Sequence, residues 1–573
     1  MRSSTSRILM FCFILGIIPS AMTQTSTGKT NFHKINKLGT TSIGAASRSS
    51  FNSNPQTRVR QHPDLVAARR GAMASGLAFT ASANSGTLSV PTPKPNAVGY
   101  GGVRLGFEGM TTVDTANTNG FVLSPPDQGL CVGNGFVMEP INLVMSIYST
   151  SGVQLTSPVA LNAFFGADPS VTFLSDPRCY YDRPTQRWFI SITNVFNNAT
   201  GRSNLYLGVS ESSDPTAGFT IYSIDTTDDG TNGTPGDPAC PCFGDQPLLG
   251  ADNYGIYLST NEFPVFANGF NGAQIYALSK ADLEAGTAST FVHIGNLPLA
   301  ESIAYSVQPA SSPDLSGEAS GGVEYFLSAL DFFGTLDNRI AVWALTNTSS
   351  LTQATPNVSL TNVVIRSETY GQPPNATQAA GPYPLGQSLG DTEEMLNSDD
   401  DRMQQVTYAS NHLWGALCTV VSDGTNLNAG IAYFNVNPKL KGATLSATLG
   451  GQNYISVKGA SALYPAIGVT ADGNAAAAFT VTGSSYYPSA AYAMVSPSHA
   501  GNVKIVAAGE APADDFSGYP QYGGPGYTRW GDYSWAVADG SSLWLATEYI
   551  PGNIDSTAYF TNFGTFVYEV NSN

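Results

Sequence analysis

One pattern recurs from residue 126 to residue 549 and limits what this chain can fold into. A polar residue opens a short apolar run, a turn rich in Asp, Asn and Gly follows, and a second apolar run comes after the turn. The last copy, GDYSWAVADGSSLWLATEY, starts at Gly531. Two apolar runs across a polar turn predict a β-hairpin. The copies begin at residues 126, 167, 244, 306, 403, 464 and 531.

Further strand-like runs lie between the copies, among them SNLYLGVSES (203–212) and NRIAVWALT (338–346), so each unit has room for about four strands. Four-stranded units arranged around an axis form a β-propeller. The sequence therefore predicts an all-β fold, a β-propeller of four-stranded blades over residues 99–573. Seven copies indicate seven blades, and six blades with one copy misassigned are the alternative. The 59 Gly and 35 Pro suit such a turn-rich fold.

The N-terminal residues indicate export. Arg2 and Arg7 form a basic region that precedes an apolar run over residues 8–18, and this run is too short to span a bilayer. Small residues near Ala21 suit cleavage by a signal peptidase. These features predict a signal peptide over residues 1–21 and a secreted, extracellular protein with no membrane span. Residues 22–98 are rich in Ser, Thr, Ala and Gly and have no apolar periodicity, which predicts a flexible, disordered leader and linker.

Charge is distributed unevenly between the leader and the body. Residues 22–98 carry nine Lys and Arg and one acid, a net charge of +8, whereas residues 99–573 carry 14 Lys and Arg and 41 acids, a net charge of −27. Because the acidic body repels phosphate groups, we expect no nucleic-acid partner. A monomer is expected, with an extracellular glycan or surface polymer as its partner.

Cysteine usage predicts some disulfide bonding. Cys12 falls within the predicted signal peptide, and in an oxidising compartment an odd number of remaining cysteines leaves at least one free or intermolecular. We expect the two sulfurs of Cys240-Pro241-Cys242 to pair elsewhere, with a metal or redox site as the alternative. The remaining cysteines are Cys131, Cys179, Cys240, Cys242 and Cys418.

The polar residues that open the copies are the strongest candidate site. In a propeller the first strand of each blade runs along the central axis, so these residues should converge at one end of it. Paired carboxylates there could act as general acid and base on a glycan or hold Ca²⁺. Alternatively, each Asp caps backbone N–H groups at the start of a strand. The residues are Asp127, Asp168, Asp245, Gln308, Gln404 and Asp532.

Arg529, Trp530, Tyr533 and Arg402 belong to the same predicted rim. Trp and Tyr rings stack on sugars and Arg binds acidic groups, which predicts substrate contacts, with ordinary packing as the alternative. LNSDDDRMQQ (396–405) has three consecutive acids, and we interpret it as a solvated turn, with a Ca²⁺ loop as the alternative.

The repeated pattern resembles the sialidase-like (neuraminidase-like) superfamily of secreted propellers. More narrowly, YPAIGVTADGNAAAAFTVTG, AAGEAPADDFSG and RWGDYSWAVADGSSLWLATEY are similar to a group of uncharacterised secreted bacterial proteins with such propellers. The likeness spans roughly residues 100–570 and implies the fold. VADGSSLW (537–544) keeps the Asp-Gly turn and Trp544 of the sialidase Asp-box, but not its other positions.

The leading hypothesis is a secreted, carbohydrate-active propeller that acts on or binds extracellular glycan at its axial pocket. The sequence does not decide whether it is an enzyme. If it is, we expect a glycoside hydrolase using a carboxylate pair, with Asp532 and Asp245 the first candidates and Asp127 and Asp168 the next. The alternative is a non-catalytic binding or adhesion propeller with a structural Asp ring. Neither hypothesis requires a cofactor, and Ca²⁺ is the ion that such an acidic ring would favour.

Overall fold

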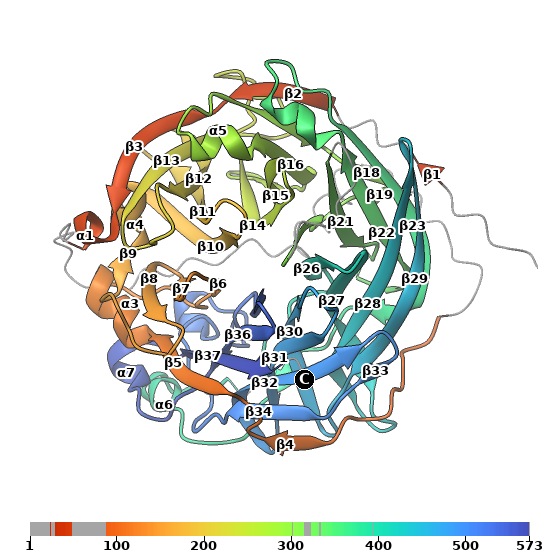
Figure 1. Ribbon diagram of the computed structural model, residues 1–573. Coiled ribbons are helices and arrows are strands. Elements are labelled where there is room, and N and C mark those ends of the chain that lie inside the picture. Colours follow the sequence, from red (N-terminus) through yellow and green to blue (C-terminus); the bar gives the residue numbers. More distant parts are fainter. Residues whose placement is uncertain are drawn as a thin grey trace, which may run out of the picture.

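The computed structural model describes residues 23–24, 29–47, 88–300, 302–313, 322–331, 334–393 and 395–571. Antiparallel runs of four strands follow one another along the chain and surround a central axis (Figure 1). In each run the first strand lies innermost and the last outermost. The fold is thus mostly β and consistent with a β-propeller. The predicted signal peptide lies outside the described residues.

The first three runs are formed entirely by consecutive strands. Strand bounds for these runs are β6 (Cys131–Gly133), β7 (Phe136–Ile141), β8 (Val144–Ser149) and β9 (Val159–Ala160); β10 (Thr172–Asp182), β11 (Arg187–Asn197), β12 (Arg202–Ser210) and β13 (Gly218–Asp225); and β14 (Cys242–Ala251), β15 (Gly255–Pro264), β16 (Gly272–Ser279) and β17 (Thr290–Gly295).

The next runs complete the ring. They are β20 (Gln308–Ser311), β21 (Val323–Ala329), β22 (Leu336–Thr346) and β23 (Ser359–Gly371); β26 (Met403–Ala409), β27 (His412–Ser422), β28 (Leu427–Lys441) and β29 (Thr444–Ile455); β30 (Ala460–Val469), β31 (Ala475–Gly483), β32 (Tyr486–Ser496) and β34 (Val503–Ala507); and β35 (Trp535–Asp539), β36 (Ser542–Tyr549) and β37 (Gly564–Asn571) with β5 (Leu105–Thr111).

Two features bear on the number of blades. Strands β20 and β26 pair in parallel through Ala310 and Ser311, which joins two of the runs into one nine-stranded sheet. Dividing that sheet at the parallel joint leaves seven runs among the described residues, but the division is our interpretation, so seven blades stays a prediction. The last run is closed by β5, which precedes all other strands of the ring and pairs with β37 in antiparallel fashion.

Part of the segment predicted to be a flexible leader forms edge strands, so that prediction is wrong for residues 29–42. Strand β2 (Lys29–Lys34) pairs with β17, and β3 (Asn36–Ser42) pairs with β13. Figure 1 shows both strands running along the outer rim. Outer strands of a sheet have unpaired backbone groups, and a polar segment without apolar periodicity can still pair with them. Short strands β1 (Thr23–Gln24) and β4 (Val98–Tyr100) pair with β23 and β34.

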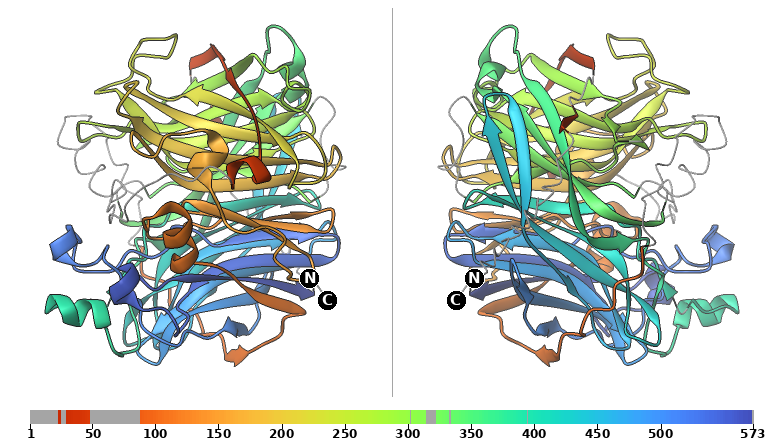
Figure 2. Two further views of the ribbon diagram at one scale, coloured as in Figure 1. Left: turned by 90° about the vertical axis from the view of Figure 1, so that its left-hand side faces the viewer. Right: turned by 90° about the vertical axis from the view of Figure 1, so that its right-hand side faces the viewer.

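Helices are short and few among the described residues, and they connect strands. Helix α5 (Lys280–Glu284) follows β16 directly. Figure 2 shows α6 and α7 projecting from one face of the molecule. None of the described helices is long and apolar enough to cross a membrane. The others are α1 (Ile43–Ala46), α3 (Thr112–Asn119), α4 (Leu161–Phe165), α6 (Pro384–Leu389), α7 (Ser556–Tyr559) and the 3₁₀ turns η2 (Thr348–Thr352) and η3 (Pro520–Tyr522). Two-stranded ribbons pair β18 (Pro298–Leu299) with β19 (Ser302–Ile303) and β24 (Ala376–Thr377) with β25 (Met395–Leu396), and β33 (His499–Ala500) pairs with β32.

The apolar core lies between neighbouring sheets. One cluster packs Trp188 of the second run against Met145 of the first. Another packs Trp535 and Trp544 of the last run against Val137 of the first, so the packing continues around the whole ring. A strand in such a sheet is buried on both faces, which explains why the inner strands are apolar at nearly every position.

Candidate functional site

One backbone conformation recurs before or within the inner strands of six runs. In run after run a non-glycine residue adopts a left-handed backbone there, with a positive φ that is costly for side chains with a Cβ. A repeated strained position indicates that the same structural problem recurs in each run. The residues are Asp127 (φ 43°), Asp176 (58°), Gln246 (51°), Ser306 (43°), Asp399 (54°) and Tyr464 (50°).

Asp127 connects three parts of the ring. Its Oδ2 accepts a hydrogen bond from Asn142 Nδ2 at 2.7 Å, and its Oδ1 accepts one from the backbone N–H of Asp532 at 2.9 Å. Asn142 in turn accepts the backbone N–H of Asp176 at 2.9 Å. The carboxylate is fully buried. Asp127 therefore caps a backbone N–H group, which is the structural alternative considered for the Asp ring.

The same arrangement occurs between the third and fourth runs. Asn261 Nδ2 donates to Gln246 Oε1 at 2.9 Å, and Asn261 Oδ1 accepts the backbone N–H of Ser306 at 2.8 Å. An asparagine near the end of a second strand thus joins the inner strand of its own run to that of the next. These contacts hold neighbouring sheets at a fixed position around the axis.

Arg529 and Asp532 form a partly exposed ion pair at this end of the axis. Arg529 Nη2 donates to both carboxylate oxygens of Asp532, at 2.8 and 2.7 Å, and the two side chains are 18% and 13% exposed. The stretch of sequence before the last hairpin therefore contributes a pair of oppositely charged side chains.

Arg402 forms a second such group. Its Nε donates to Asp400 at 2.8 Å, its Nη1 to Gln246 at 2.7 Å and its Nη2 to Asp399 at 3.0 Å. The charge of Asp532 acts on both Asp399 and Arg402, so the two ion pairs lie close to each other. Together they place two guanidinium groups and three carboxylates at the mouth of the axis.

The acidic stretch 399–401 is mostly buried, so the predicted solvated turn is wrong. Asp400 and Asp401 are almost fully buried, and Asp399 keeps 19% of its side chain exposed. Burial raises the pKa of Asp399 well above its ordinary value, although Arg402 acts in the opposite direction. Asp399 can therefore hold a proton at a pH where an exposed aspartate cannot, while Asp532 beside it is ion-paired.

The predicted aromatic contacts are packed inside the protein. Trp530 is 2% exposed, and its Nε1 donates to Thr480 at 3.1 Å. Tyr533 is 3% exposed, donates its hydroxyl to Asp176 at 2.9 Å, and stacks under the guanidinium of Arg178 at 3.3 Å from its ring centre. Neither ring offers a free face to a sugar, so packing, the alternative considered, accounts for both.

Two of the four candidate catalytic aspartates lie away from the ion pairs. Asp168 is on an exposed turn, where its carboxylate accepts a hydrogen bond from the backbone N–H of Ser170. Asp176 occupies the ring position that was predicted for Asp168. Asp245 is buried in β14, and the ring contact in that strand is made by its neighbour Gln246. Asp532 and Asp245 therefore have different roles. Asp532 belongs to an ion pair, whereas Asp245 is buried in a strand beside the residue that makes the ring contact.

The two glutamine candidates lie on inner strands and are buried. Gln308 Nε2 donates to the carbonyl of Met403 at 3.1 Å, which supports the joint between β20 and β26. Gln404 is 2% exposed, and its neighbour Gln405 bonds both backbone groups of Ala536 instead. Gln308 thus stabilises a contact between inner strands, whereas the buried Nε2 of Gln404 has no hydrogen-bond partner among the described residues.

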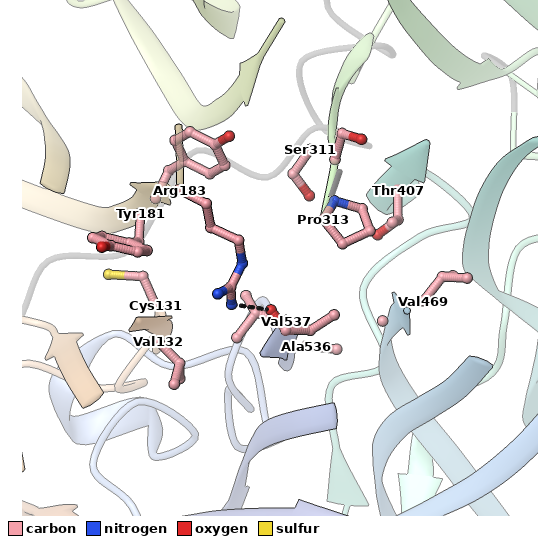
Figure 3. Close-up of a pocket in the computed structure, with 14 residues that line it drawn as sticks. Cys131, Val132, Tyr181, Arg183, Ser311, Pro313, Thr407, Val469, Ala536 and Val537 are labelled. Atoms are coloured by element: carbon pink, nitrogen blue, oxygen red, sulfur yellow. Dashed lines mark hydrogen bonds between the residues drawn. The ribbon is translucent and has the colours of Figure 1, made fainter. Parts of the chain in front are cut away.

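A small pocket opens at the opposite end of the axis (Figure 3). It is lined by the far ends of the inner strands, and its volume of about 40 Å³ suits a few water molecules. Arg183 points across it and donates to the carbonyl of Ala538 at 2.8 Å, and it also pairs with Asp539 at 2.8 Å. These contacts close the far end of the axis.

Two surface features lie outside the axis. Phe266 is 73% exposed and meets Phe196 edge to face at 5.2 Å; Phe266 lies in the loop after β15 and Phe196 near the end of β11. Because β11 and β15 run toward the face where β10 and β14 begin, this aromatic pair lies on the face where the inner strands start. A larger groove of about 610 Å³ lies near the outer edge, between residues 93–97 and residues that include Tyr454 and His499.

The disulfides differ from the prediction in one respect. Cys131 and Cys179 join β6 to β10, and Cys418 is buried and free, as an odd number of cysteines requires. Cys240 and Cys242, expected to pair elsewhere, bond to each other. The two sulfurs are therefore not available as thiolate ligands for a metal.

Comparison with known proteins gives distant structural similarity alone. No protein-family model and no curated protein sequence matches the chain. Drosophila Semaphorin 1b, extracellular domains 1–2, is 10% identical, with a TM-score of 0.32 over 85% of this chain and 88% of that one. An α-L-arabinanase from Penicillium chrysogenum is 12% identical, with a TM-score of 0.29 over 71% and 94%.

A third solved structure, an exo-β-1,3-galactanase from Clostridium thermocellum, is 12% identical, with a TM-score of 0.26 over 68% of this chain and 78% of that one. At such TM-scores the likeness says nothing about activity or site residues. The resemblance to sialidases stays a prediction. The chain is distantly similar in structure to carbohydrate-active propeller enzymes and to a semaphorin, and no sequence family is shown.

Proposed function

We propose that this protein is a secreted, seven-bladed propeller that binds an extracellular glycan on the face where its inner strands start. The observation that carries the proposal is the pair of partly exposed ion pairs, Arg529–Asp532 and Arg402–Asp399, at the mouth of the axis. Guanidinium and carboxylate groups held rigidly in this way bind neighbouring hydroxyl groups of a sugar in a fixed orientation.

The exposed aromatic pair of Phe266 and Phe196 supports the same face as the binding surface. Sugar rings stack on aromatic side chains, and the exposed ring of Phe266 is available for such stacking. The buried Trp530 and Tyr533 do not take part in this proposal. The role of Asp127 is structural, because both of its oxygens bond to groups of the ring.

Binding without cleavage is the function that the geometry favours. Asp532 is neutralised by Arg529, and Asp127 and Asp176 are engaged within the ring. Hydrolysis is the second candidate, because the carboxyl groups of Asp399 and Asp532 belong to two ion pairs that lie close to each other. Two neighbouring carboxyl groups are what a glycosidase requires.

The experiment is a glycan-array screen of the purified protein, with a reducing-sugar assay on every glycan that binds. We expect Asp532→Asn and Phe266→Ser each to weaken binding at least about tenfold, since each removes a contact worth roughly 1–2 kcal/mol. If hydrolysis occurs, Asp399→Asn should lower sugar release by a larger factor than it lowers binding.

Asp539→Asn is the matched control. It breaks another Arg–Asp pair, that with Arg183, but at the opposite end of the axis. Thermal melts of all variants separate loss of binding from loss of folding. No bound glycan with the wild-type protein, or binding that is equal in Asp532→Asn, Phe266→Ser and the control, would contradict the proposal and direct attention to the groove near Tyr454.

A further inference from the structure

Three carboxylates converge where the second run meets the third. Asp228 and Asp237 belong to the loop 226–241 between β13 and β14, and Glu262 lies near the end of β15. One oxygen of each carboxylate lies within 4.8 Å of the others. Asp228 and Glu262 are each 1% exposed, so this group is almost completely removed from solvent.

Each of these carboxylates has one oxygen that receives no hydrogen bond. Asn271 Nδ2 donates to Glu262 Oε1 at 2.8 Å, and Asn296 Nδ2 donates to Asp237 Oδ1 at 2.9 Å. Asp228 Oδ2, Asp237 Oδ2 and Glu262 Oε2 are buried and have no donor. Buried carboxylate oxygens without a partner are energetically costly, so something else must satisfy them.

A neutral group, the hydroxyl of Tyr276, lies beside these carboxylates. Tyr276 is 1% exposed, and among charged groups Asp228 and then Glu262 act most strongly on its hydroxyl. The side chain of Thr260 also acts on this hydroxyl, but no hydrogen bond joins the phenol to either acid. A buried phenol beside carboxylates would ordinarily donate to one of them. A ligand or water between the phenol and the acids would take the place of that hydrogen bond.

The nearby cation is already neutralised. Arg202 donates from Nε and Nη2 to Asp225, at 2.9 and 2.6 Å, and from Nη1 to Asp229, at 3.0 and 2.9 Å. It therefore balances two carboxylates outside the group of three. The disulfide between Cys240 and Cys242 adds no charge. The charge of Arg202 reaches Asp228, but no Lys or Arg among the described residues forms an ion pair with the three converging carboxylates.

We propose that Asp228, Asp237 and Glu262 form a Ca²⁺ site that ties the loop 226–241 to β15. All its side-chain ligands are oxygens, which suit hard cations, and Ca²⁺ accepts the irregular geometry of three carboxylates completed by backbone carbonyls and water. Mg²⁺ requires a more regular octahedron and keeps more of its own water. The inference is independent of glycan binding.

A shared proton is the competing explanation for the same carboxylates. Burial raises the pKa of Asp228 to about 7, and it raises that of Glu262 well above its ordinary value. A proton between the two would also relieve their repulsion, but it would leave Asp237 and the Tyr276 hydroxyl unsatisfied. The two explanations differ in whether the metal-free protein gains stability from Ca²⁺ at neutral pH.

The experiment uses the full-length protein stripped of metal with EDTA and returned to Ca²⁺ or Mg²⁺ at pH 7.5. We expect equilibrium dialysis to give one Ca²⁺ bound per chain, and 1 mM Ca²⁺ to raise the Tm by roughly 2–5 °C. Tb³⁺ in place of Ca²⁺ should luminesce when tyrosine is excited, because Tyr276 lies beside the site. Tyr276→Phe should remove most of that luminescence but not Ca²⁺ binding.

Glu262→Gln should lower Ca²⁺ affinity at least tenfold and, because it relieves repulsion, raise the Tm measured in EDTA. Asp237→Asn serves as a second variant if Glu262→Gln does not fold. Asp214→Asn, which changes the net charge equally in a turn outside the site, should behave like the wild type. The proposal is overturned by an absence of Ca²⁺ binding, by equal binding in Glu262→Gln, by equal affinity for Mg²⁺, or by a Tm that responds to pH alone.

Discussion

Asp127 joins the first and last parts of the ring through its carboxylate. Replacing it with Ala would leave the N–H of Asp532 and one N–H of the Asn142 amide without an acceptor, while the other N–H of that amide keeps the carbonyl of Pro125. We expect Asp127→Ala to lower the free energy of unfolding by roughly 2–4 kcal/mol in urea denaturation. Asp168→Ala, on an exposed turn, should change it by less than about 1 kcal/mol. Equal effects of the two substitutions would argue against a structural role for Asp127.

Glu139 is a second residue whose contribution to stability can be measured, through the pH dependence of the free energy of unfolding. It lies on β7 against the closing run, accepts from Thr565 at 2.6 Å, and burial raises its pKa to about 7. The folded protein therefore binds this proton more tightly than the unfolded chain does. The contribution of Glu139 to the free energy of unfolding is fully present below pH 4.5 and is lost as the pH rises through 7. Across that window the loss is up to roughly 3 kcal/mol.

Glu139→Gln removes this titration, because an amide does not ionise. Between pH 5 and pH 8 the free energy of unfolding should fall more in the wild type than in Glu139→Gln. Other buried acids titrate in both proteins, so the difference between the two is the informative quantity. If the free energies of unfolding of the wild type and Glu139→Gln differ by the same amount at pH 5 and at pH 8, the pKa of Glu139 is not raised by burial.

Several ring positions could have been identified from sequence by a better signal. Asp176, Gln246 and Tyr464 are each followed by a proline and then by an apolar run. A residue before proline avoids the right-handed helical region, which suits the unusual backbone at these positions. The repeated pattern, in which a polar residue precedes the first apolar run, predicted Asp168 instead. The burial of Asp399 and Asp400 could not be predicted, because it depends on Arg402, whose partners come from three-dimensional packing.

At the scale of secondary structure, the hairpins were predictable and the outer strands were not. Each inner hairpin is buried on both faces, so its apolar runs are visible in the sequence. Strands β2 and β3 lie on the rim, where most side chains face solvent, and few apolar residues mark them. Backbone pairing with β17 and β13 holds them, and backbone pairing leaves little trace in side-chain patterns.

Ile35 is the exception, and it allows a test of this outer segment. It is 5% exposed and packs into the apolar cluster between the second and third runs, whereas Phe32 on the neighbouring strand is 49% exposed. We expect Ile35→Ala to destabilise the segment locally by roughly 2 kcal/mol. Hydrogen exchange should then increase about 30-fold over residues 29–42 with little change in β10. Phe32→Ala should leave exchange unchanged, and faster exchange in both variants would contradict a specific role for Ile35.

At the scale of the whole molecule, the closing strand decides whether the ring can form. Strand β5 supplies the fourth strand of the last run, and Thr565 beside it bonds Met110 and Glu139. A chain that begins at residue 98 should fold to the native state, because it retains β4 and β5. A chain that begins at residue 112 should expose β37 and fail to give a cooperative melt or a compact peak in size-exclusion chromatography. Native-like behaviour of the shorter chain would show that packing alone closes the ring.

The pairing of β5 with β37 also sets an order in time. During synthesis β5 leaves the ribosome more than 400 residues before its partner, since one ends at Thr111 and the other begins at Gly564. For that whole interval the strand has an unsatisfied edge and must avoid pairing with the strands that emerge after it. The ring can therefore be completed only once the last strand has been made, and a ribosome that stalls anywhere before residue 564 leaves a chain that cannot close.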